Sequence, residues 1–181
     1  MSTCFRTRQT LDAPEGAGKT RAAFQFLGAM AESGYNCLFI SLEEHKDSDL
    51  FIKKRDEYLS KKAQQYIECV SELPQGYDTL VNLAPYFDCI FIDGWGKVAG
   101  GQGKLDFFRK SQDGKFMFII YQRTVKGSMR GGSDSAFDGD LICKAHKDAD
   151  YKNNYLYWSK NRYNSNMKYR YLIHEEVCIS Q

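Results

Sequence analysis

The sequence predicts an α/β fold with a mostly parallel central sheet flanked by helices and an antiparallel β extension near its C-terminus. Two patterns predict it. Short apolar runs typical of buried strands alternate with helix-like segments from residue 13 to residue 122. After residue 150, two strand-like segments follow one another with no helix between them. Helical connections allow parallel pairing, whereas consecutive strands pair antiparallel.

Each expected element has a local reason in the sequence. The first helix carries apolar side chains at helical spacing and is followed by Gly34, which suits the residue after a helix end. The second begins at Asp47-Ser-Asp, residue types that cap helix N-termini. The first strand is polar, whereas most later strands are almost wholly apolar. In chain order we expect strands at residues 3–13, 37–40, 66–70, 89–93, 115–122, 141–144, 155–160 and 168–173, and helices at residues 19–33, 47–62, 78–83 and 104–111.

Composition places the chain among ordinary globular proteins. Its 181 residues are predicted to form one domain, residues 1–181, and 43% of them are hydrophobic. No apolar run reaches the length of a membrane span, and the N-terminal residues lack the apolar core of a signal peptide. The six cysteines include no CxxC pair, which favours reduced thiols in a cytoplasmic protein over disulfide or metal roles. A net charge of +2 is too small for the overall charge of the chain to indicate nucleic-acid binding.

The most informative motif is the glycine-rich turn between the first strand and the first helix. Residues 13–20 read Ala-Pro-Glu-Gly-Ala-Gly-Lys-Thr, a phosphate-binding loop of Walker A type in which Ala13 replaces the usual first glycine. Glycines let backbone N–H groups turn toward an anion, and the helix N-terminus adds partial positive charge. Lys19 can reach the β- and γ-phosphates, and Thr20 can hold Mg²⁺. The residues predicted to bind ATP are Pro14, Glu15, Gly16, Ala17, Gly18, Lys19, Thr20 and Arg21.

A second motif offers a carboxylate to the same metal ion. Cys89-Ile-Phe-Ile-Asp93 has the form of a Walker B strand, in which four apolar residues precede an acidic one. Ligands of open α/β sheets bind at the carboxyl ends of the strands, so Asp93 is expected beside Thr20 and Mg²⁺. The alternative is an aspartate that only caps the loop after a buried strand.

Two further strand ends carry polar side chains suited to that edge of the sheet. Glu43 can orient and deprotonate an attacking water, and Glu44 is its competitor because strand alternation sends the two side chains in opposite directions. Gln122 ends the strand at residues 115–122, where a neutral amide can sense the γ-phosphate. The simpler explanations are solvated loop charges for the two glutamates and a solvent-facing amide for Gln122.

A pair of cations follows near the C-terminus. Lys160 and Arg162 lie two residues apart and would share one face of an extended strand. Such a pair can reach the phosphates of a nucleotide bound to a neighbouring subunit, as an arginine finger does. The alternative is a basic edge strand that discourages aggregation.

Two loops with basic residues follow the Walker B strand and the strand that ends at Gln122. Cations among glycines at residues 94–103 and 124–135 can track a phosphate backbone without reading bases. The alternative is a pair of flexible surface loops. The candidate nucleic-acid contacts in or beside them are Lys97, Lys104, Arg123, Lys126 and Arg130.

The order of these motifs resembles the ATPase core of the RecA superfamily, especially its RadA and DnaB-helicase branches. The resemblance covers roughly residues 10 to 175 and implies a RecA-type P-loop NTPase fold. It also implies Mg²⁺-dependent ATP hydrolysis, a homo-oligomeric ring or filament with ATP sites between subunits, and single-stranded DNA bound by the two loops during recombination, repair or replication. No oligomerisation arm is recognised, so a stand-alone core is expected. The segments that carry the resemblance are residues 13–20, Phe39-Ile-Ser-Leu-Glu43-Glu44, Ile90-Phe-Ile-Asp93, Phe118-Ile-Ile-Tyr-Gln122, Met129-Arg-Gly-Gly-Ser, Phe137-Asp-Gly-Asp140 and Lys160-Asn-Arg-Tyr163.

Two other functions remain open from the sequence. A small P-loop kinase would pass a phosphoryl group to a metabolite, with residues 124–135 and Arg130 as an arginine-bearing lid. A nucleotide-binding regulator without turnover would use ATP only to drive assembly. A phosphorylated small-molecule product would identify the kinase, and release of free phosphate would identify the ATPase. ATP-dependent oligomers without phosphate release would identify the regulator.

Overall fold

All strands of the described chain belong to one twisted sheet. The computed structural model describes residues 7–122, 140–164 and 168–180. Within them the strand order is β3-β2-β4-β5-β1-β6-β7-β8-β9. The strands are β1 (Arg8–Ala13), β2 (Cys37–Ser41), β3 (Ile67–Val70), β4 (Cys89–Asp93), β5 (Phe116–Gln122), β6 (Leu141–His146), β7 (Tyr155–Asn161), β8 (Tyr169–Leu172) and β9 (Val177–Ser180).

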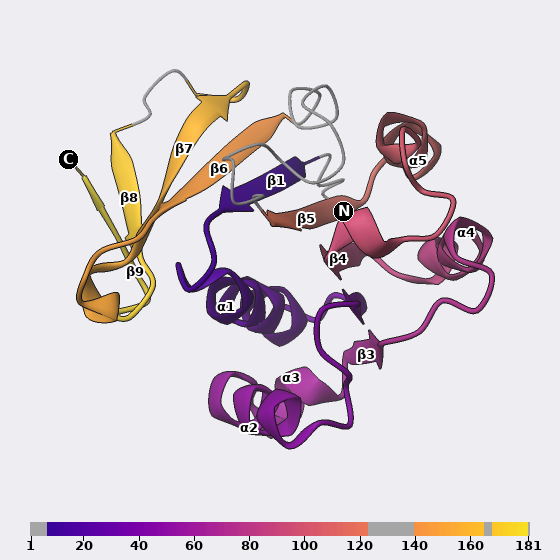
Figure 1. The fold of residues 1–181 in the computed structure, drawn as a ribbon, viewed down its shortest axis with the longest axis horizontal. Helices are drawn as coiled ribbons and strands as arrows, with labels where there is room; N and C mark the ends of the chain where they lie inside the picture. The colour runs from indigo at the N-terminus through magenta and orange to yellow at the C-terminus, as the bar shows by residue number, and fades with distance from the viewer. Residues whose placement is uncertain (1–6, 123–139, 165–167, 181) are drawn as a thin grey trace.

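The helices cover both faces of the parallel part of this sheet. Strands β1 to β6 pair in parallel, and β6 to β9 pair antiparallel. Helices α1 to α3 lie on one side of the strands and α4 and α5 on the other, while β8 and β9 extend away from the helical layers (Figure 1). The helices are α1 (Lys19–Glu32), α2 (Asp49–Tyr58), α3 (Lys61–Gln64), α4 (Tyr77–Leu83) and α5 (Leu105–Ser111), with 3₁₀ turns η1 (Ala84–Tyr86), η2 (Trp95–Lys97) and η3 (Tyr151–Asn153).

Two apolar clusters fix the sheet between its helices. On the α1 side, the rings of Phe24 and Phe39 meet edge to face with centroids 5.1 Å apart, and Phe51 of α2 joins them. On the other side, Phe108 of α5 packs beside Trp95 and the apolar strand residues. Because β2 and β4 are buried on both faces, their sequences read as continuous apolar runs.

The polar character of the first strand has a structural reason. β1 lies in the middle of the sheet between β5 and β6, where Gln9, Thr10 and Asp12 are all buried. A fully buried side chain from α5, Arg109, donates from Nη2 to Thr10 Oγ1 at 2.6 Å. The Thr10 hydroxyl therefore ties α5 to the sheet.

Two elements differ from the sequence-based expectation. The helix expected at residues 47–62 is two helices, because Leu59 is extended and buried while the Ser60 hydroxyl caps α3. A Cβ on Gly28 of α1 would lie 3.2 Å from Leu59 Cδ2, so the missing side chain at Gly28 lets Leu59 pack there. No sequence pattern indicated β9, which pairs with β8 through a turn containing Glu176 at φ +59°. None of the helices in the described ranges is both long and apolar enough to cross a membrane.

Candidate functional site

The loop between β1 and α1 has the backbone that a phosphate cradle requires. Gly16 and Gly18 adopt φ of +75° and +89°, and Gly18 is the N-cap of α1 without a side-chain capping bond. The first N–H groups of α1 therefore remain available to an anion. Ala13 is the last residue of β1, where it is buried and pairs with Gln122 of β5. Its φ is not positive, since Glu176 is the only non-glycine with a positive φ among the described residues. An ordinary backbone at Ala13 explains why this position needs no glycine.

Lys19 lies inside the curve of this loop. Its Nζ donates to the carbonyl oxygens of Ala13 and Pro14 at 3.3 and 3.2 Å. Burial lowers the pKa of Lys19, while the charges of Asp93, Glu15 and Glu43 oppose that shift. The ammonium is thus held at the loop by backbone acceptors and surrounded by carboxylates.

Thr20 and Asp93 meet at the carboxyl edge of the sheet, as the two motifs predicted from sequence imply. The Thr20 hydroxyl donates to Asp93 Oδ2 at 3.1 Å, and Asp93 is only 3% exposed. Burial first, and then the charge of Glu43, raise the pKa of Asp93 to about 6, against the hydrogen bond from Thr20 and the charge of Lys19. A hydroxyl and a carboxylate are the oxygen donors that Mg²⁺ accepts beside phosphate and water, so these residues fit the ion. A bound cation would favour the charged form of a carboxylate that burial disfavours.

The raised pKa of Asp93 predicts how the stability of the metal-free protein changes with pH. An unfolded aspartate titrates near about 3.9, so the folded state holds this proton more tightly. The resulting stabilisation is complete below about pH 4 and is lost as the pH rises through about 6. Asp93→Asn removes the charge and keeps an oxygen for Thr20. In EDTA without nucleotide, we expect the variant to be more stable than the parent at pH 7.5 by about 1–3 kcal/mol.

Urea unfolding at pH 5 and pH 7.5 checks this. The advantage of the variant is expected to shrink at pH 5, because the parent then carries a protonated Asp93. An equal stability difference at both pH values would contradict the shifted titration.

The structure distinguishes the two adjacent glutamates. Glu43 Oε2 lies 2.8 Å from Lys97 Nζ, and a Cβ on Gly94 would lie 2.8 Å from Glu43 Oε1. Glu44 turns the other way, with its Oε2 2.7 Å from Lys54 Nζ of α2. Glu43 therefore lies against the turn that follows Asp93, and its charge acts on both Asp93 and Lys19.

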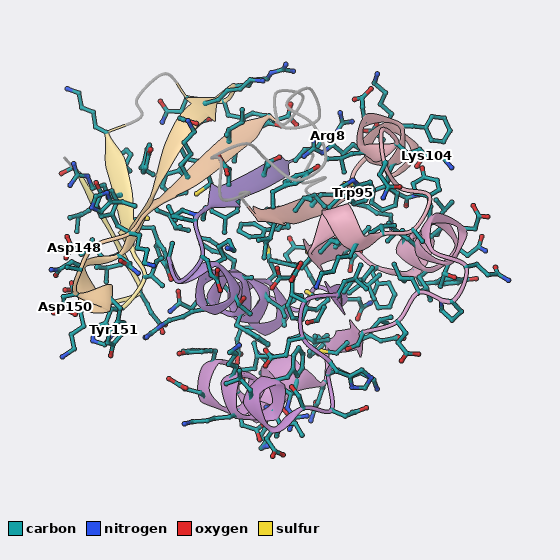
Figure 2. The ribbon with its side chains drawn as sticks, in the orientation of Figure 1. Arg8, Trp95, Lys104, Asp148, Asp150 and Tyr151 are labelled. Carbon is teal, nitrogen blue, oxygen red and sulfur yellow. The ribbon has the colours of Figure 1, made fainter. Side chains whose placement is uncertain are left out.

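Side chains from the connection between β6 and β7 also hold the phosphate-binding loop. Lys147 Nζ donates to the Glu15 carbonyl at 3.0 Å, and Asn154 Nδ2 donates to the Gly16 carbonyl at 3.3 Å. Asn154 is 4% exposed, and its Oδ1 accepts from the Asp148 amide at 2.8 Å. Figure 2 shows Asp148, Asp150 and Tyr151 together at this connection. Sequence reasoning missed these residues, because no local motif marks a lysine or asparagine more than a hundred residues from its partner.

Asn154 links the loop to the rest of the sheet, which gives a specific expectation. Asn154→Ala removes the donor to the Gly16 carbonyl and the acceptor of the Asp148 amide. Because Gly16 is exposed and Asp148 is partly exposed, water can replace the lost partner, and we expect a cost of about 0.5–1.5 kcal/mol. We expect a several-fold weaker affinity for ATP, measured by calorimetry, together with a lower melting temperature. Unchanged ATP affinity would show that the loop keeps its shape without this contact.

A small cavity lies beside the phosphate-binding loop. It has a volume of about 70 Å³, and the rings of Tyr151 and His174 at its wall meet edge to face with centroids 5.7 Å apart. Arg21 donates from Nη2 to the His174 carbonyl at 3.4 Å, and its guanidinium lies over the Tyr58 ring. The residues lining the cavity are Gly16, Gly18, Arg21, Tyr151, Asn154, Ile173 and His174.

The expected finger residues lie at the opposite edge of the sheet. β7 runs antiparallel to β6, so Lys160 pairs with Ile142 near the amino ends of the parallel strands, while the phosphate-binding loop follows their carboxyl ends (Figure 1). The register shifts beside Ile142, and β7 ends at Asn161. Arg162 therefore lies beyond the strand rather than on it, with Nη1 3.6 Å from Asp140 Oδ1. The two cations are not near the loop of their own chain.

The candidate nucleic-acid contacts fall into two groups. Lys97 contacts Glu43, and Lys104 Nζ lies 4.6 Å from the centroid of the Tyr77 ring. Both follow β4, on the side of the molecule where Figure 2 labels Trp95 and Lys104. The segment around them is a series of hydrogen-bonded turns rather than an open loop, with Lys97, Val98, Gly101 and Lys104 each donating to a residue three positions earlier. Arg123, Lys126 and Arg130, with the expected lid at 124–135, lie outside the described residues.

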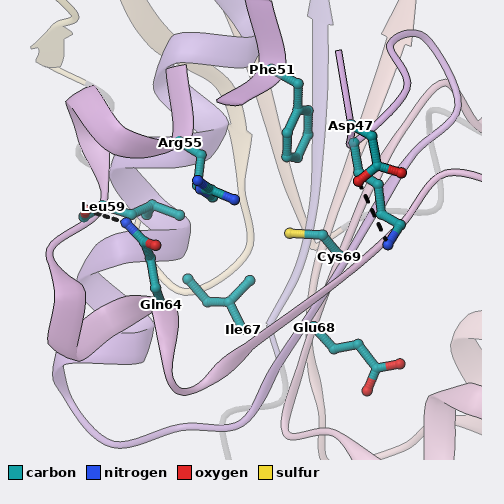
Figure 3. A pocket seen from close by; sticks show the side chains of 9 residues that line it. Asp47, Phe51, Arg55, Leu59, Gln64, Ile67, Glu68 and Cys69 are labelled. Atoms are coloured by element: carbon teal, nitrogen blue, oxygen red, sulfur yellow. Dashed lines mark hydrogen bonds and ion pairs between the residues drawn. The ribbon is translucent and has the colours of Figure 1, made fainter. Parts of the chain in front are cut away.

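A larger cavity lies away from this chemistry. It has a volume of about 310 Å³ and lies between α2, α3 and the edge strand β3 (Figure 3). Phe51, Arg55, Ile67 and Cys69 line it, and it shares no residue with the phosphate-binding loop. The described residues contain no cluster of three or more metal-binding side chains, there or elsewhere.

Comparison with known proteins shows similarity at the level of structure alone. No protein-family model matches the sequence, and no curated protein matches it. A KaiC-like protein from the archaeon Pyrococcus horikoshii superposes with a TM-score of 0.69 at 18% identity, covering 97% of this chain and 89% of that one. A DnaB-like replicative helicase gives a TM-score of 0.64 at 13% identity over 87% of this chain and 54% of that one.

A third solved structure, that of an ATPase domain, agrees with these two. It has a TM-score of 0.63 at 14% identity, covering 87% of this chain and 78% of that domain. This chain spans about half the length of the helicase. The prediction of fold class is confirmed at this level: the chain shares its fold with these three solved structures, two of which carry branches or domains of the kind that the sequence resembles.

Proposed function

We propose that this protein is a Mg²⁺-dependent ATP hydrolase of RecA type that couples hydrolysis to the binding of single-stranded DNA. The observation that carries the proposal is the hydrogen bond between Thr20 and Asp93. It joins the two motifs at one sheet edge, with the charges of Lys19 and Glu43 acting on the same carboxylate. Phosphate binding, metal binding and base catalysis would thus converge on one place.

Each residue has a role that its surroundings support. Lys19 and the first N–H groups of α1 would hold the triphosphate. Thr20 and Asp93 would hold Mg²⁺, which supplies charge neutralisation for the transferred phosphoryl group. Glu43 would orient and deprotonate the attacking water, and Gln122, at the end of β5 beside Ala13, would sense the γ-phosphate.

The remaining predictions concern other molecules. Lys160 and Arg162 lie at the edge opposite to their own phosphate-binding loop, which supports a role at the nucleotide of a neighbouring subunit and hence a homo-oligomer. A DnaB-like replicative helicase shares the fold, which supports single-stranded DNA as the partner. Lys97 and Lys104 are the described candidates for backbone contacts.

Phosphate release tests the proposal most directly. It is measured with ATP and Mg²⁺, with and without single-stranded DNA, at several protein concentrations. A rate that rises with DNA, and more than linearly with protein, supports coupled hydrolysis at sites between subunits. A phosphorylated small-molecule product would instead identify a kinase. ATP-dependent oligomers without phosphate release would identify a regulator.

A further inference from the structure

One cation connects the turn after Asp93 to the carboxylate proposed as the base. Lys97 Nζ lies 2.8 Å from Glu43 Oε2 and donates to the Leu42 carbonyl at 3.1 Å. Both acceptors belong to the segment that follows β2, whereas Lys97 belongs to the segment that follows β4. The ion pair therefore bridges two neighbouring strand ends at the edge where the phosphate-binding loop lies.

The backbone on both sides of this ion pair is fixed. Trp95 and Val98 are 3% and 1% exposed, so the short turn η2 that carries Lys97 is anchored in the apolar core. Gly94 adopts φ +97°, and a side chain there would collide with Glu43. The Leu42 amide donates to the Asp93 carbonyl at 3.0 Å, which ties the two segments together. A change of partner therefore involves the side chains of Lys97 and Glu43 and leaves the backbone in place.

The Lys97 side chain is more exposed to solvent than the Glu43 side chain with which it pairs. Glu43 is 21% exposed and faces the site, while Lys97 is 46% exposed and reaches solvent. A lysine ammonium is a compact charge on a flexible stem, so it can move to another anion without movement of the backbone. A phosphate of single-stranded DNA that approaches this surface competes with Glu43 for the same ammonium.

We propose that Lys97 is a positioning residue that holds Glu43 in a resting arrangement and releases it when a DNA phosphate takes over the ammonium. In the resting arrangement, one carboxylate oxygen of Glu43 accepts from Lys97 and is not available to a water molecule. Transfer of the ammonium to phosphate lets that oxygen accept a proton from the attacking water. The proposal rests on the proposed function and adds to it the means by which DNA raises the rate.

Competition for one ammonium must act in both directions, because coupling between two binding equilibria is reciprocal. Removing the Glu43 charge is therefore expected to tighten DNA binding by about twofold to fivefold, the range set by a partly exposed ion pair. Glu44→Gln is the matched control. It removes the same charge at the next residue, from a carboxylate that pairs with Lys54 and not with Lys97. Fluorescence anisotropy of a labelled oligothymidylate, without ATP, measures both affinities.

The binding experiment includes two further variants. Lys97→Met is expected to weaken oligothymidylate binding, and Lys97→Met/Glu43→Gln is expected to bind as Lys97→Met does, because the gain from Glu43→Gln needs Lys97. If Glu43→Gln and Glu44→Gln tighten binding equally, or if the gain persists in the double variant, the competition is refuted. None of these measurements requires hydrolysis, so the result stands apart from that of the proposed function.

Hydrolysis provides the second readout. Lys97→Met is expected to raise the DNA-independent kcat about twofold to fivefold and to remove most of the stimulation by DNA, with KM for ATP unchanged. Lys97→Arg keeps a cation and should keep the low basal rate. Lys110→Met removes the exposed lysine–aspartate pair on α5 and should not raise it. A basal rate that stays low in Lys97→Met, in a protein whose parent is stimulated by DNA, would overturn the proposal.

Discussion

Lys19→Ala is expected to lower ATP turnover by at least about a hundredfold, the usual cost of removing one preorganised donor from a developing negative charge. In the structure Lys19 is held by the carbonyl oxygens of Ala13 and Pro14 and lies near Asp93, Glu15 and Glu43. Without its positive charge, a triphosphate would enter a loop edged by carboxylates and would lose the ammonium that lies inside the curve of the loop.

Calorimetry with a non-hydrolysable ATP analogue and a phosphate-release assay measure the two consequences. We expect weaker binding and no measurable turnover, with a melting temperature close to that of the parent. Lys110→Ala is a suitable control, because Lys110 is 68% exposed and pairs with Asp106 on α5. Turnover within a few-fold of the parent in Lys19→Ala would place the nucleotide somewhere other than this loop.

Glu43→Gln is expected to bind ATP as the parent does and to lose about 10²- to 10⁴-fold in kcat, the range that general base catalysis supplies. The amide preserves the size of the side chain beside Gly94, where space is limited, so the loop after β4 should keep its position. The amide no longer accepts a proton from water. Single-turnover measurements separate the retained binding from the lost chemistry.

Glu44→Gln distinguishes the two candidates for the base. Glu44 pairs with Lys54 on α2, whereas Glu43 pairs with Lys97 in the turn that follows Asp93, so we expect the kcat of Glu44→Gln to stay within a few-fold of the parent. A large loss in Glu44→Gln with little effect in Glu43→Gln would transfer the role to Glu44. Retained hydrolysis in both variants would show that neither carboxylate acts as the base.

The fold could be predicted from the sequence to a large extent because its determinants are local. The glycines at positions 16 and 18 meet the need for positive φ in the loop, and the apolar runs of β2, β4 and β5 reflect burial on both faces. The errors arose where a distant contact overrode a local pattern. Leu59 interrupts the expected helix because it packs against Gly28, which is 31 positions earlier in the chain. β9 has no apolar face that is buried, and its residues give little pattern to find.

In the candidate site too, the residues in local motifs could be predicted, and the residues that act through distant contacts could not. The motifs predicted Lys19, Thr20 and Asp93 as a group, and the structure brings Thr20 and Asp93 into contact. The roles of Gln122, Lys160 and Arg162 stay predictions, as do those of the nucleic-acid contacts. Lys147 and Asn154 were absent from the sequence-based site, since a lysine and an asparagine in a polar connection have no distinctive spacing.

By itself the sequence determined the order of the strands from β1 to β8 and most of the helices, the glycine-rich loop and the acidic strand end, because backbone preference and hydrophobic period depend on neighbouring residues. Only the tertiary structure showed that Glu43 lies beside the turn after Asp93 with Lys97 as its partner, that Glu44 pairs with Lys54, and that the connection after β6 contacts the loop. Glu43 and Lys97 are 54 residues apart, and Gly16 and Asn154 are 138 apart. Contacts over such separations depend on how the strands are ordered in the sheet, which no local pattern contains.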